Sequence, residues 1–502
     1  MTPRPEDMVA TYEPNIGLEV HAELSTRTKV FCGCSTAAGA PPNSQVCPVC
    51  LGFPGVLPVL NRNVVEYALR AALAMHCAIS RPSIFERKGY YYPDLPKNFQ
   101  ISQKRAPLGK DGYLEIGANG AAKRVRIADV HIEEDAAKLL HPEDDPQHSL
   151  VDFNRSGIPL LEIVSQPDMG SVAEVEAYMA SIRSMLLYLG ISEARMEQGQ
   201  LRFEASVSVR PEGATELGTR VEIKNLNSFR AVTGAVDYEI RRQTRALEQG
   251  ERIVQETRRW AGARGATEPR RTKETAMDYR YFPEPDLTPL EIDDGWIARV
   301  RAELPELAEV RKKRLVSEYG FSEYDAAVLT SDKSAADAVE AAIKQENVEP
   351  EFAKNLVTGP GFRWRKMRED GSGEATQHVQ GGASQFLWTP DREAAVIAGL
   401  FRLVASEQIT GTAARDYYPR ILDSHKEVED FVREQGLQIS DRDELKRLAE
   451  DVIAENPDAV ENFRKGKEAA LKFLVGQVMR KSKGRANPQM ATELLRARLA
   501  AQ

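Results

Sequence analysis

Carboxylates and a histidine occupy one face of an alternating stretch near the start of the chain. Between residues 15 and 24, Glu19, His21 and Glu23 alternate with apolar residues. Because successive side chains of a strand point to opposite faces, these three side chains project to the same side. A carboxylate on a strand is costly to bury unless it is paired or coordinates a cation. The spacing therefore predicts a strand whose polar face binds a cation or a charged substrate.

Further carboxylates fall on other expected strands. The segment 131–135 reads His-Ile-Glu-Glu-Asp, Glu162 lies inside an apolar run, and Glu204 lies in an alternating stretch. Several converging carboxylates suit Mg²⁺, which prefers oxygen ligands and keeps waters for substrate phosphates. Histidine is a less usual Mg²⁺ ligand and suits a transition metal better. The residues alone leave open the alternative of a solvent-facing strand surface with ion pairs.

Four of the five cysteines fall within nineteen residues, spaced as Cys-x-Cys, twelve residues and Cys-x2-Cys: Cys32, Cys34, Cys47 and Cys50. In a cytosolic chain such clustering favours a metal over disulfides. Thiolates this close on tight turns can converge on one tetrahedral Zn²⁺, and four soft ligands with no open position describe a structural site. Four buried free thiols are the alternative. We expect one zinc ion that folds a loop and performs no chemistry, with Cys77 uninvolved.

Two segments interleave basic and aromatic residues. Residues 87–100 contain Arg87, Lys88 and four aromatic residues, and a similar mixture recurs at 278–283. Aromatic rings can stack on bases while lysine and arginine neutralise phosphates. The alternative is that the rings pack a proline-rich loop against the core.

The elements that must position these residues indicate an α+β fold. Strands are expected at 15–24, 201–209 and 220–224, with helices at 171–189 and 228–249, and the order is not a regular βαβ repeat. After a proline-rich stretch, 281–290, the sequence becomes helical to its end, apart from a glycine-rich segment at 370–383 that we expect to be a loop. A length of 502 residues suits two to four domains.

Composition and charge limit the class of protein. No stretch approaches the roughly 20 apolar residues of a membrane span, and the polar start is not a secretory signal, so the cytoplasm is the expected compartment. The net charge is −8, yet residues 461–502 hold ten Lys/Arg against three Glu, a balance of +7, which leaves −15 for the rest. A basic tail on an acidic body can bind an RNA backbone locally. A solvated helical face is the alternative.

Some common catalytic motifs are absent from the sequence. It has no Walker-type phosphate loop and no Gly-x-Ser-x-Gly elbow. It also lacks a Ser-Ser-Lys amidase signature. If the chain uses ATP, it must bind it with a structure other than a Walker-type loop. Because the amidase signature is absent, the chain is not expected to hydrolyse glutamine itself.

Ordered motifs along nearly the whole chain resemble the B-subunit family of bacterial tRNA-dependent amidotransferases. They include GLEVH at 17–21, the cysteine cluster running into GFPG, YYPDLPK at 91–97, IEED at 132–135, NRSGIPLLEIV at 154–164, EIKNLNS at 222–228, DYRYFPEPDL at 278–287 and FLVGQVM at 473–479. The segment 340–406 matches least.

The resemblance implies a cradle-shaped N-terminal domain at 1–293, a helical domain at 294–408 and a YqeY-like helical tail at 409–502 that binds tRNA. It implies a heterotrimer with an amidase A subunit and a small C subunit. The reaction would convert Glu-tRNA(Gln), and often Asp-tRNA(Asn), to the amide. ATP would turn the side-chain carboxylate into an acyl phosphate, with Mg²⁺ offsetting the phosphate charge.

By family match, the metal–ATP site would contain Glu19, His21, Glu134, Glu162 and Glu204, with Lys88 as a further nucleotide-binding residue and Glu19, His21, Glu134 and Glu204 as magnesium ligands. One position departs from the family pattern Arg-Cys-Asp-x-Asn, because this chain reads Arg202-Phe203-Glu204-Ala205-Ser206. The longer carboxylate puts the coordination there in doubt. Two other functions stay open: a non-catalytic tRNA-binding scaffold and a zinc-stabilised RNA-binding regulator.

Overall fold

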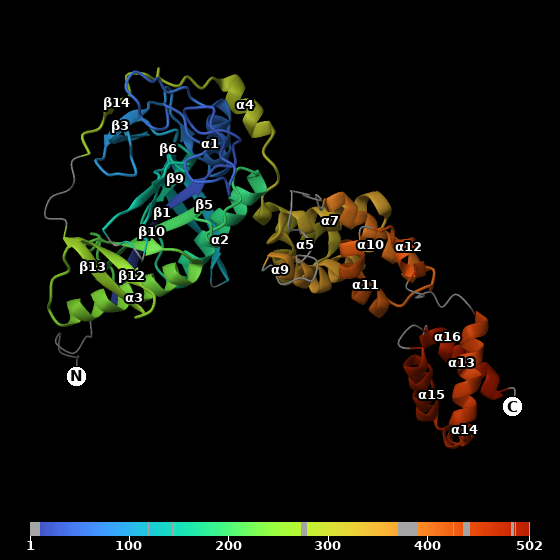
Figure 1. The fold of residues 1–502 in the computed structure, drawn as a ribbon. Coiled ribbons are helices and arrows are strands. Elements are labelled where there is room, and N and C mark those ends of the chain that lie inside the picture. Colours follow the sequence, from blue (N-terminus) through green and yellow to red (C-terminus); the bar gives the residue numbers. More distant parts are fainter. Residues whose placement is uncertain are drawn as a thin grey trace, which may run out of the picture. The chain divides into compact units, whose positions relative to one another are not determined.

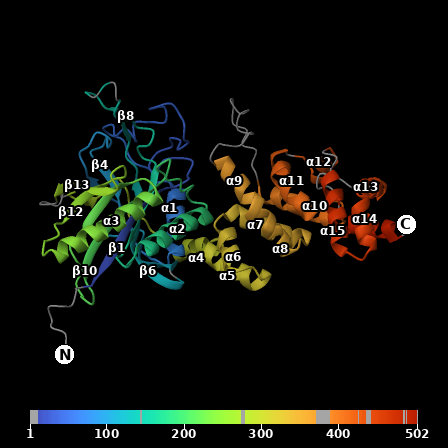
Figure 2. The same cartoon turned by 90° about the horizontal axis from the view of Figure 1, so that it is seen from below.

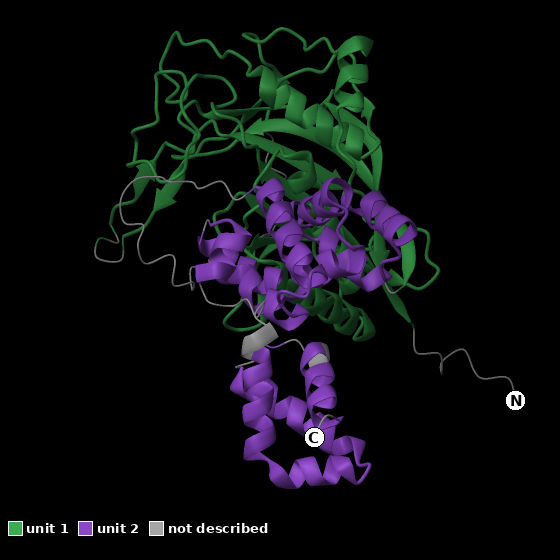
Figure 3. Ribbon diagram, turned by 90° about the vertical axis from the view of Figure 1, so that its right-hand side faces the viewer, with its two compact units in different colours: residues 1–307 green, residues 308–502 purple. Residues whose placement is uncertain are grey.

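The computed structural model describes residues 11–118, 120–142, 145, 147–272, 279–369, 389–424, 426–434, 442–482, 486 and 488–500. The chain divides into two compact units, Met1–Leu307 and Ala308–Gln502, coloured separately in Figure 3. Strands gather in the first unit and the second is helical, so the predicted α+β class is confirmed. The three-domain boundaries at 293 and 408 stay a prediction.

A nine-stranded mixed sheet forms the centre of the first unit (Figure 1). Its order is β13-β12-β11-β10-β1-β9-β6-β5-β2, and among these pairs β11 and β12 run parallel while the others are antiparallel. The strands are β1 (Tyr12–Glu23), β2 (Ala78–Ile79), β5 (Gly109–Ala118), β6 (Ala121–Glu134), β9 (Pro159–Ser165), β10 (Leu201–Pro211), β11 (Val221–Leu226), β12 (Glu256–Ala261) and β13 (Ala266–Thr272).

Three helices cover the apolar face of this sheet. Helices α1 (Arg62–Ala74), α2 (Val172–Leu189) and α3 (Phe229–Glu248) contribute buried residues to the same core as Ile16, Leu18, Val20 and Ala22 of β1. Figure 2 shows α2 and α3 side by side against the strands. Because these apolar residues alternate with Glu19 and His21, packing the helices on one face leaves the polar residues on the other.

Within the described part of the first unit, two smaller sheets and helix α4 accompany the large sheet and its three helices. The strands β14 (Phe282–Pro283), β3 (Glu86–Gly89) and β4 (Phe99–Ser102) form a three-stranded sheet, and β7 (Lys138–Leu140) pairs with β8 (Leu150–Asp152). Helix α4 (Asp294–Ala302) follows, and the side chain of Asp293 caps its start.

The second unit contains two separate hydrophobic clusters. The first is built from α5 (Ala308–Tyr319), α6 (Glu323–Thr330), α7 (Lys333–Glu346), α8 (Pro350–Leu356), the π-helical turn Val357–Gly361, α9 (Phe362–Glu369), α10 (Pro390–Ala405), α11 (Gly411–Ser424) and α12 (Val428–Glu434). The second is built from α13 (Arg442–Glu455), α14 (Pro457–Arg464), α15 (Glu468–Lys481) and α16 (Pro488–Ala500). The glycine-rich segment 370–383 lies outside the described residues.

Candidate active site

Strand register brings the charged residues of four neighbouring strands into one row. Strand β1 pairs with β10 on one side and β9 on the other, and β9 pairs with β6. Glu19 lies opposite Glu204, His21 opposite Glu162, and Glu162 opposite His131. Directly opposed residues of antiparallel strands have side chains on the same face, within interaction range. Residues far apart in the sequence therefore meet on the polar face.

Two histidines converge on one carboxylate oxygen at the centre of this row. The Nε2 atoms of His21 and His131 lie 3.4 and 3.2 Å from Oε2 of Glu162. Oε1 of Glu133 lies 3.5 Å from His131 Nε2. We call these four residues the carboxylate cluster. His21, Glu133 and Glu162 each offer a possible ligand atom, and those atoms all lie within 4.8 Å of one another.

Hydrogen bonds from β4 and a lysine from β3 fix Glu133. Ser102 Oγ donates to Oε1 at 2.7 Å, and Gln100 Nε2 donates to Oε2 at 3.0 Å. Lys88 Nζ lies 4.0 Å from Oε1 of Glu133. The structure therefore places Lys88, predicted to bind the nucleotide, beside the carboxylate cluster.

Burial and neighbouring charges shift the pKa values of Glu162, His131 and His21 in opposite directions, and the neighbouring charges have the larger effect. Burial disfavours charge on Glu162, but the two imidazoles outweigh it and hold the pKa of Glu162 well below its usual range. Burial also disfavours charge on His131, yet Glu162, Asp129 and Glu133 raise its pKa well above the usual value. The pKa of His21 is raised in the same way by Glu162. The resting cluster is therefore a set of charged, mutually paired groups.

Glu19 and Glu204 extend the row beyond the cluster. Burial, followed by the charges of Glu162 and Glu204, raises the pKa of Glu19. Oε2 of Glu204 lies 2.7 Å from Nζ of Lys224 on β11. A divalent cation would stabilise the charged form of Glu19, which burial and the charges of Glu162 and Glu204 disfavour. The residues present fit a bound Mg²⁺.

Glu134 lies apart from the cluster in this structure. Its carboxylate contacts Lys97 Nζ and accepts a hydrogen bond from the backbone N–H of Ile101 at 3.0 Å. Glu133 and Glu134 are consecutive on β6, so their side chains leave the strand on opposite sides. His131 and Glu133 were missed as site residues, although counting in steps of two from the histidine would have selected them.

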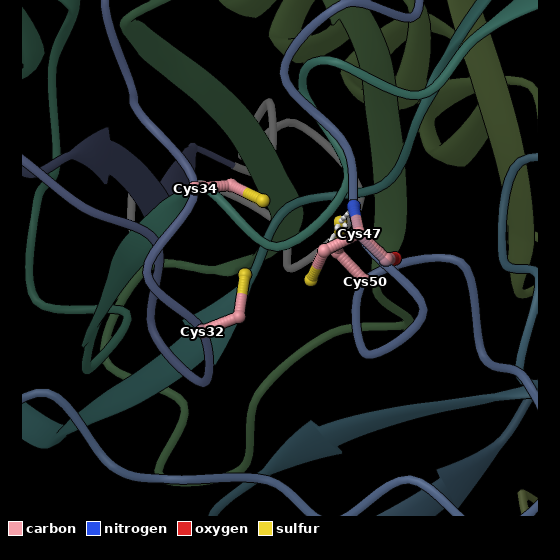
Figure 4. A group of neighbouring side chains, drawn as sticks. All are labelled: Cys32, Cys34, Cys47 and Cys50. Carbon is pink, nitrogen blue, oxygen red and sulfur yellow. Dashed lines mark hydrogen bonds between the residues drawn. The ribbon is translucent and has the colours of Figure 1, made fainter.

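The four clustered cysteines come together as expected from their spacing (Figure 4). Their sulfur atoms lie within 4.8 Å of one another, and all four are free thiols. Hydrogen bonding with Cys32 lowers the pKa of Cys50 to about 4 against the opposing effect of burial, and the charge of buried Lys29 contributes. Four converging sulfur donors fit a closed tetrahedral Zn²⁺ site. Cys77 lies elsewhere, against Gly109 and Gly112.

The two aromatic–basic segments, 87–100 and 278–283, are far apart in the sequence but contribute to one small sheet. Phe282 pairs with Arg87 across β14 and β3, and Lys88 Nζ lies 5.2 Å from the ring centroid of Tyr279. Arg87 makes two hydrogen bonds to Glu284, at 2.7 and 2.8 Å. The structure thus joins motifs that the sequence presents separately.

In the basic tail, ion pairs occupy part of the positive charge. Lys465, Lys481, Arg496 and Arg498 contact Glu461, Glu455, Glu468 and Glu450, respectively. Lys483 and Arg485 lie outside the described residues. The charge available to an RNA backbone is therefore smaller than the sequence count of +7.

Comparisons with known proteins agree with this architecture. A family model of the GatB/GatE catalytic domain matches residues 14–298, and a model of the GatB domain matches residues 387–499. The B subunit of the aspartyl/glutamyl-tRNA(Asn/Gln) amidotransferase from Caldanaerobacter subterraneus subsp. tengcongensis is 49% identical over 489 residues, covering 97% of this chain and 99% of that protein. The B subunit of the same name from Moorella thermoacetica is 49% identical over 491 residues, covering 97% of this chain and 100% of its own length.

Within the described parts of the chain, no helix is long and apolar enough to cross a membrane. The matching domains and relatives span both units and include the strands that carry the carboxylate cluster. The chain therefore belongs to the family of aspartyl/glutamyl-tRNA(Asn/Gln) amidotransferase B subunits.

Proposed function

We propose that this chain activates the side-chain carboxylate of a mischarged tRNA with ATP and presents it to ammonia. The substrate is Glu-tRNA(Gln), with Asp-tRNA(Asn) as a second candidate, and the products are the corresponding amides. The enzyme is thus a carbon–nitrogen ligase that uses glutamine as amide donor. The observation that supports this proposal is the row of carboxylates beside Lys88 on the polar face of the sheet.

The chemistry explains why such a row is needed. A carboxylate is a poor electrophile because its negative charge repels ammonia. One of its oxygens attacks the γ-phosphorus of ATP, ADP leaves, and an acyl phosphate forms. Ammonia then attacks the acyl carbon, inorganic phosphate leaves, and a proton is released. Nearly all catalysis in the first step is positioning and charge stabilisation.

Each residue of the row has a proposed role. Glu162, Glu19 and Glu204 would hold Mg²⁺, which when bound neutralises charge on the transferring phosphoryl group. His21 would join them as a ligand only after losing its proton, because its pKa is raised in the resting cluster. Lys88 would add a second positive charge at the phosphate. Glu133 is a further candidate ligand on geometry. Glu134 can act as a ligand only after its carboxylate leaves Lys97.

Other subunits would supply the ammonia. The sequence lacks a Ser-Ser-Lys amidase signature, so glutamine hydrolysis would belong to an amidase A subunit in a heterotrimer with a small C subunit. The four cysteines would bind a structural zinc. A cytoplasmic location follows from a role in translation.

The test uses the reconstituted trimer with each mischarged tRNA offered in turn. We expect tRNA-dependent ATP hydrolysis and amide formation, and an at least about 10²-fold loss of both in Glu162→Gln. The matched control is Glu115→Gln on β5, because Glu115 is exposed and paired only at the surface with Arg124. If Glu162→Gln forms amide at the parent rate, the chain is a tRNA-binding scaffold and the activating site lies elsewhere.

A further inference from the structure

Lys29 is a buried cation without a carboxylate partner among the described residues. Its side chain is fully buried, and its Nζ donates a hydrogen bond to the backbone oxygen of Phe153 at 3.2 Å. Every other buried lysine or arginine that the structure describes forms an ion pair at 2.6–2.9 Å: Arg258 with Glu256, Arg311 with Glu340, Lys354 with Asp325 and Arg365 with Glu393. A buried ammonium is costly unless an opposite charge compensates it. The surroundings of Lys29 must therefore supply that charge in another form.

The four-cysteine site lies beside Lys29. The backbone N–H of Lys29 donates to the backbone oxygen of Cys34 at 3.0 Å, across the turn that carries Cys32 and Cys34. The Cδ atom of Lys29 and the Cβ atom of Cys50 lie close to Gly157, because a Cβ added there would be 3.5 and 3.7 Å from them. The backbone of Lys29 thus contacts one cysteine pair, and its side chain approaches the other.

The charge of a zinc-loaded site matches this cation. Four thiolates around one Zn²⁺ leave two negative charges in excess. A neighbouring ammonium offsets one of them, and the thiolates in turn compensate the buried ammonium. The charge of Lys29 acts on Cys50 in this structure. It helps to lower the pKa of that thiol, after the hydrogen bonds of Cys50 with Cys32 and with the backbone of Cys47.

One carboxylate also approaches this region. The Oε2 atom of Glu134 would lie 3.9 Å from the same added Cβ on Gly157. That carboxylate already contacts Nζ of Lys97 and accepts a hydrogen bond from the backbone N–H of Ile101. The charge of Glu134 is therefore compensated without Lys29.

We propose that Lys29 is the counter-cation of the four-cysteine site and retains the bound zinc by offsetting the charge of its thiolates. Lys29 does not bind the metal and acts through the ligands, so it is a positioning residue. The inference rests on the zinc site of the proposed function. It differs from a site held by four thiolates alone, because removing the charge of Lys29 should release metal while all four ligands stay in place.

Zinc affinity is measured with the full-length chain by competition with a chromophoric chelator at fixed pH. Lys29→Met and Lys29→Gln should both weaken zinc binding by about 10- to 100-fold, the scale for losing an outer-shell partner of a metal ligand. Glutamine keeps a donor for the Phe153 carbonyl but removes the charge, so the pair separates charge from hydrogen bonding. Lys29→Arg keeps the charge and should bind zinc much more tightly than either neutral variant.

Ser156→Ala is the matched control. Ser156 is buried, and its Oγ donates to the backbone oxygen of Cys50 at 3.2 Å, so this variant disturbs the same loop without changing its charge. It should lower the melting temperature and leave zinc affinity close to the parental value. Lys29→Met should destabilise the zinc-loaded chain more than the zinc-free chain, because weaker binding reduces the stabilisation that zinc provides. A role in packing alone would destabilise both forms equally.

Parental zinc affinity in Lys29→Gln would overturn the proposal, because the charge would then not matter. Parental affinity in both neutral variants, together with a loss of ATP hydrolysis by the trimer, would assign Lys29 to Glu134 instead. If neither neutral variant folds even with excess zinc, the rate of zinc release is compared between the parent and Lys29→Arg. Equal rates are expected, and release about tenfold faster would contradict a role that depends on charge.

Zinc binding requires no turnover, so this inference and the proposed activation of the carboxylate fail separately. A parent trimer that makes no amide would overturn the activation and leave the role of Lys29 standing. A parent chain that binds no zinc would overturn the zinc site and the role of Lys29 but leave the activation standing.

Discussion

His131 Nε2 lies 3.2 Å from Oε2 of Glu162, the same oxygen that His21 approaches at 3.4 Å. The side chains of His131 and Glu162 are only 11% and 13% exposed. Asp129 Oδ1 lies 2.7 Å from the other ring nitrogen of His131 and so fixes the orientation of the imidazole. One carboxylate thus joins strands β1, β9 and β6 at the centre of the proposed site.

Glu162→Gln should lower the free energy of unfolding of the first unit by roughly 3 kcal/mol near pH 6, because it leaves buried imidazolium groups without their carboxylate. The pKa of Glu162 is lowered, so its contribution is lost as pH falls through that lowered pKa. The pKa of His131 is raised, so its contribution is complete below about pH 6.5 and is lost as pH rises through the raised pKa. Urea unfolding across pH, with Glu115→Gln as control, should show the deficit shrinking at alkaline pH. A deficit that does not vary with pH would contradict this ion pairing.

Glu204 is the position at which the sequence departs from the family pattern, and the structure pairs it with Lys224. Glu204→Ala should reduce Mg²⁺-dependent ATP hydrolysis by the trimer at least about 10²-fold, since a charge-stabilising ligand is removed. Glu204→Asp alone should lower Mg²⁺ affinity, and adding Ser206→Asn should restore part of it. Magnesium titrations of the single and double variants give the comparison. Parental activity in Glu204→Ala would show that Glu204 is not a ligand.

Cys47→Ser should lower the melting temperature by at least about 5 °C. The loss of stability should be larger than the loss of catalysis, because a closed metal site contributes folding energy rather than chemistry. Metal analysis should find one zinc per parent chain and a large loss in the variant. Cys77→Ala is the control and should keep its zinc, since Cys77 lies outside the cysteine site. Less than about half an equivalent of zinc in the parent would contradict a tight site.

Removing residues 461–502 should weaken tRNA binding and flatten its salt dependence, because lysine and arginine contacts to phosphate release counterions. The structure shows that this deletion also removes Leu474 and Val478 from the core that covers Leu445.

A charge variant, Lys472→Gln with Arg480→Gln, is therefore the cleaner test, and it should reduce the slope of log affinity against log salt by about 1 to 2. Glutamine hydrolysis without tRNA should not change. An unchanged affinity and slope would make the tail a solvated surface.

Local patterns in the sequence determined the elements and which side chains share a face. The alternation that places Glu19 and His21 on the polar side of β1 is a property of consecutive residues, because a strand repeats every two residues. The capping serines Ser171 and Ser228 likewise begin α2 and α3 where the sequence predicts helices. The cysteine site could also be predicted from the sequence, because the two cysteine pairs are close enough in sequence for their two turns to converge.

Tertiary structure alone decided which strands are neighbours and in what register. Nothing local places Glu162 opposite both His21 and His131, because a shift of one residue in either pairing would turn its side chain to the helix-covered face. The same holds for Tyr90 and Tyr279, nearly two hundred residues apart, which meet because β3 and β14 share a sheet. Register is set by packing the buried faces of the whole sheet against α1, α2 and α3. The sequence therefore determined the chemical groups, and the packing of distant strands decided that Glu162 meets both His21 and His131.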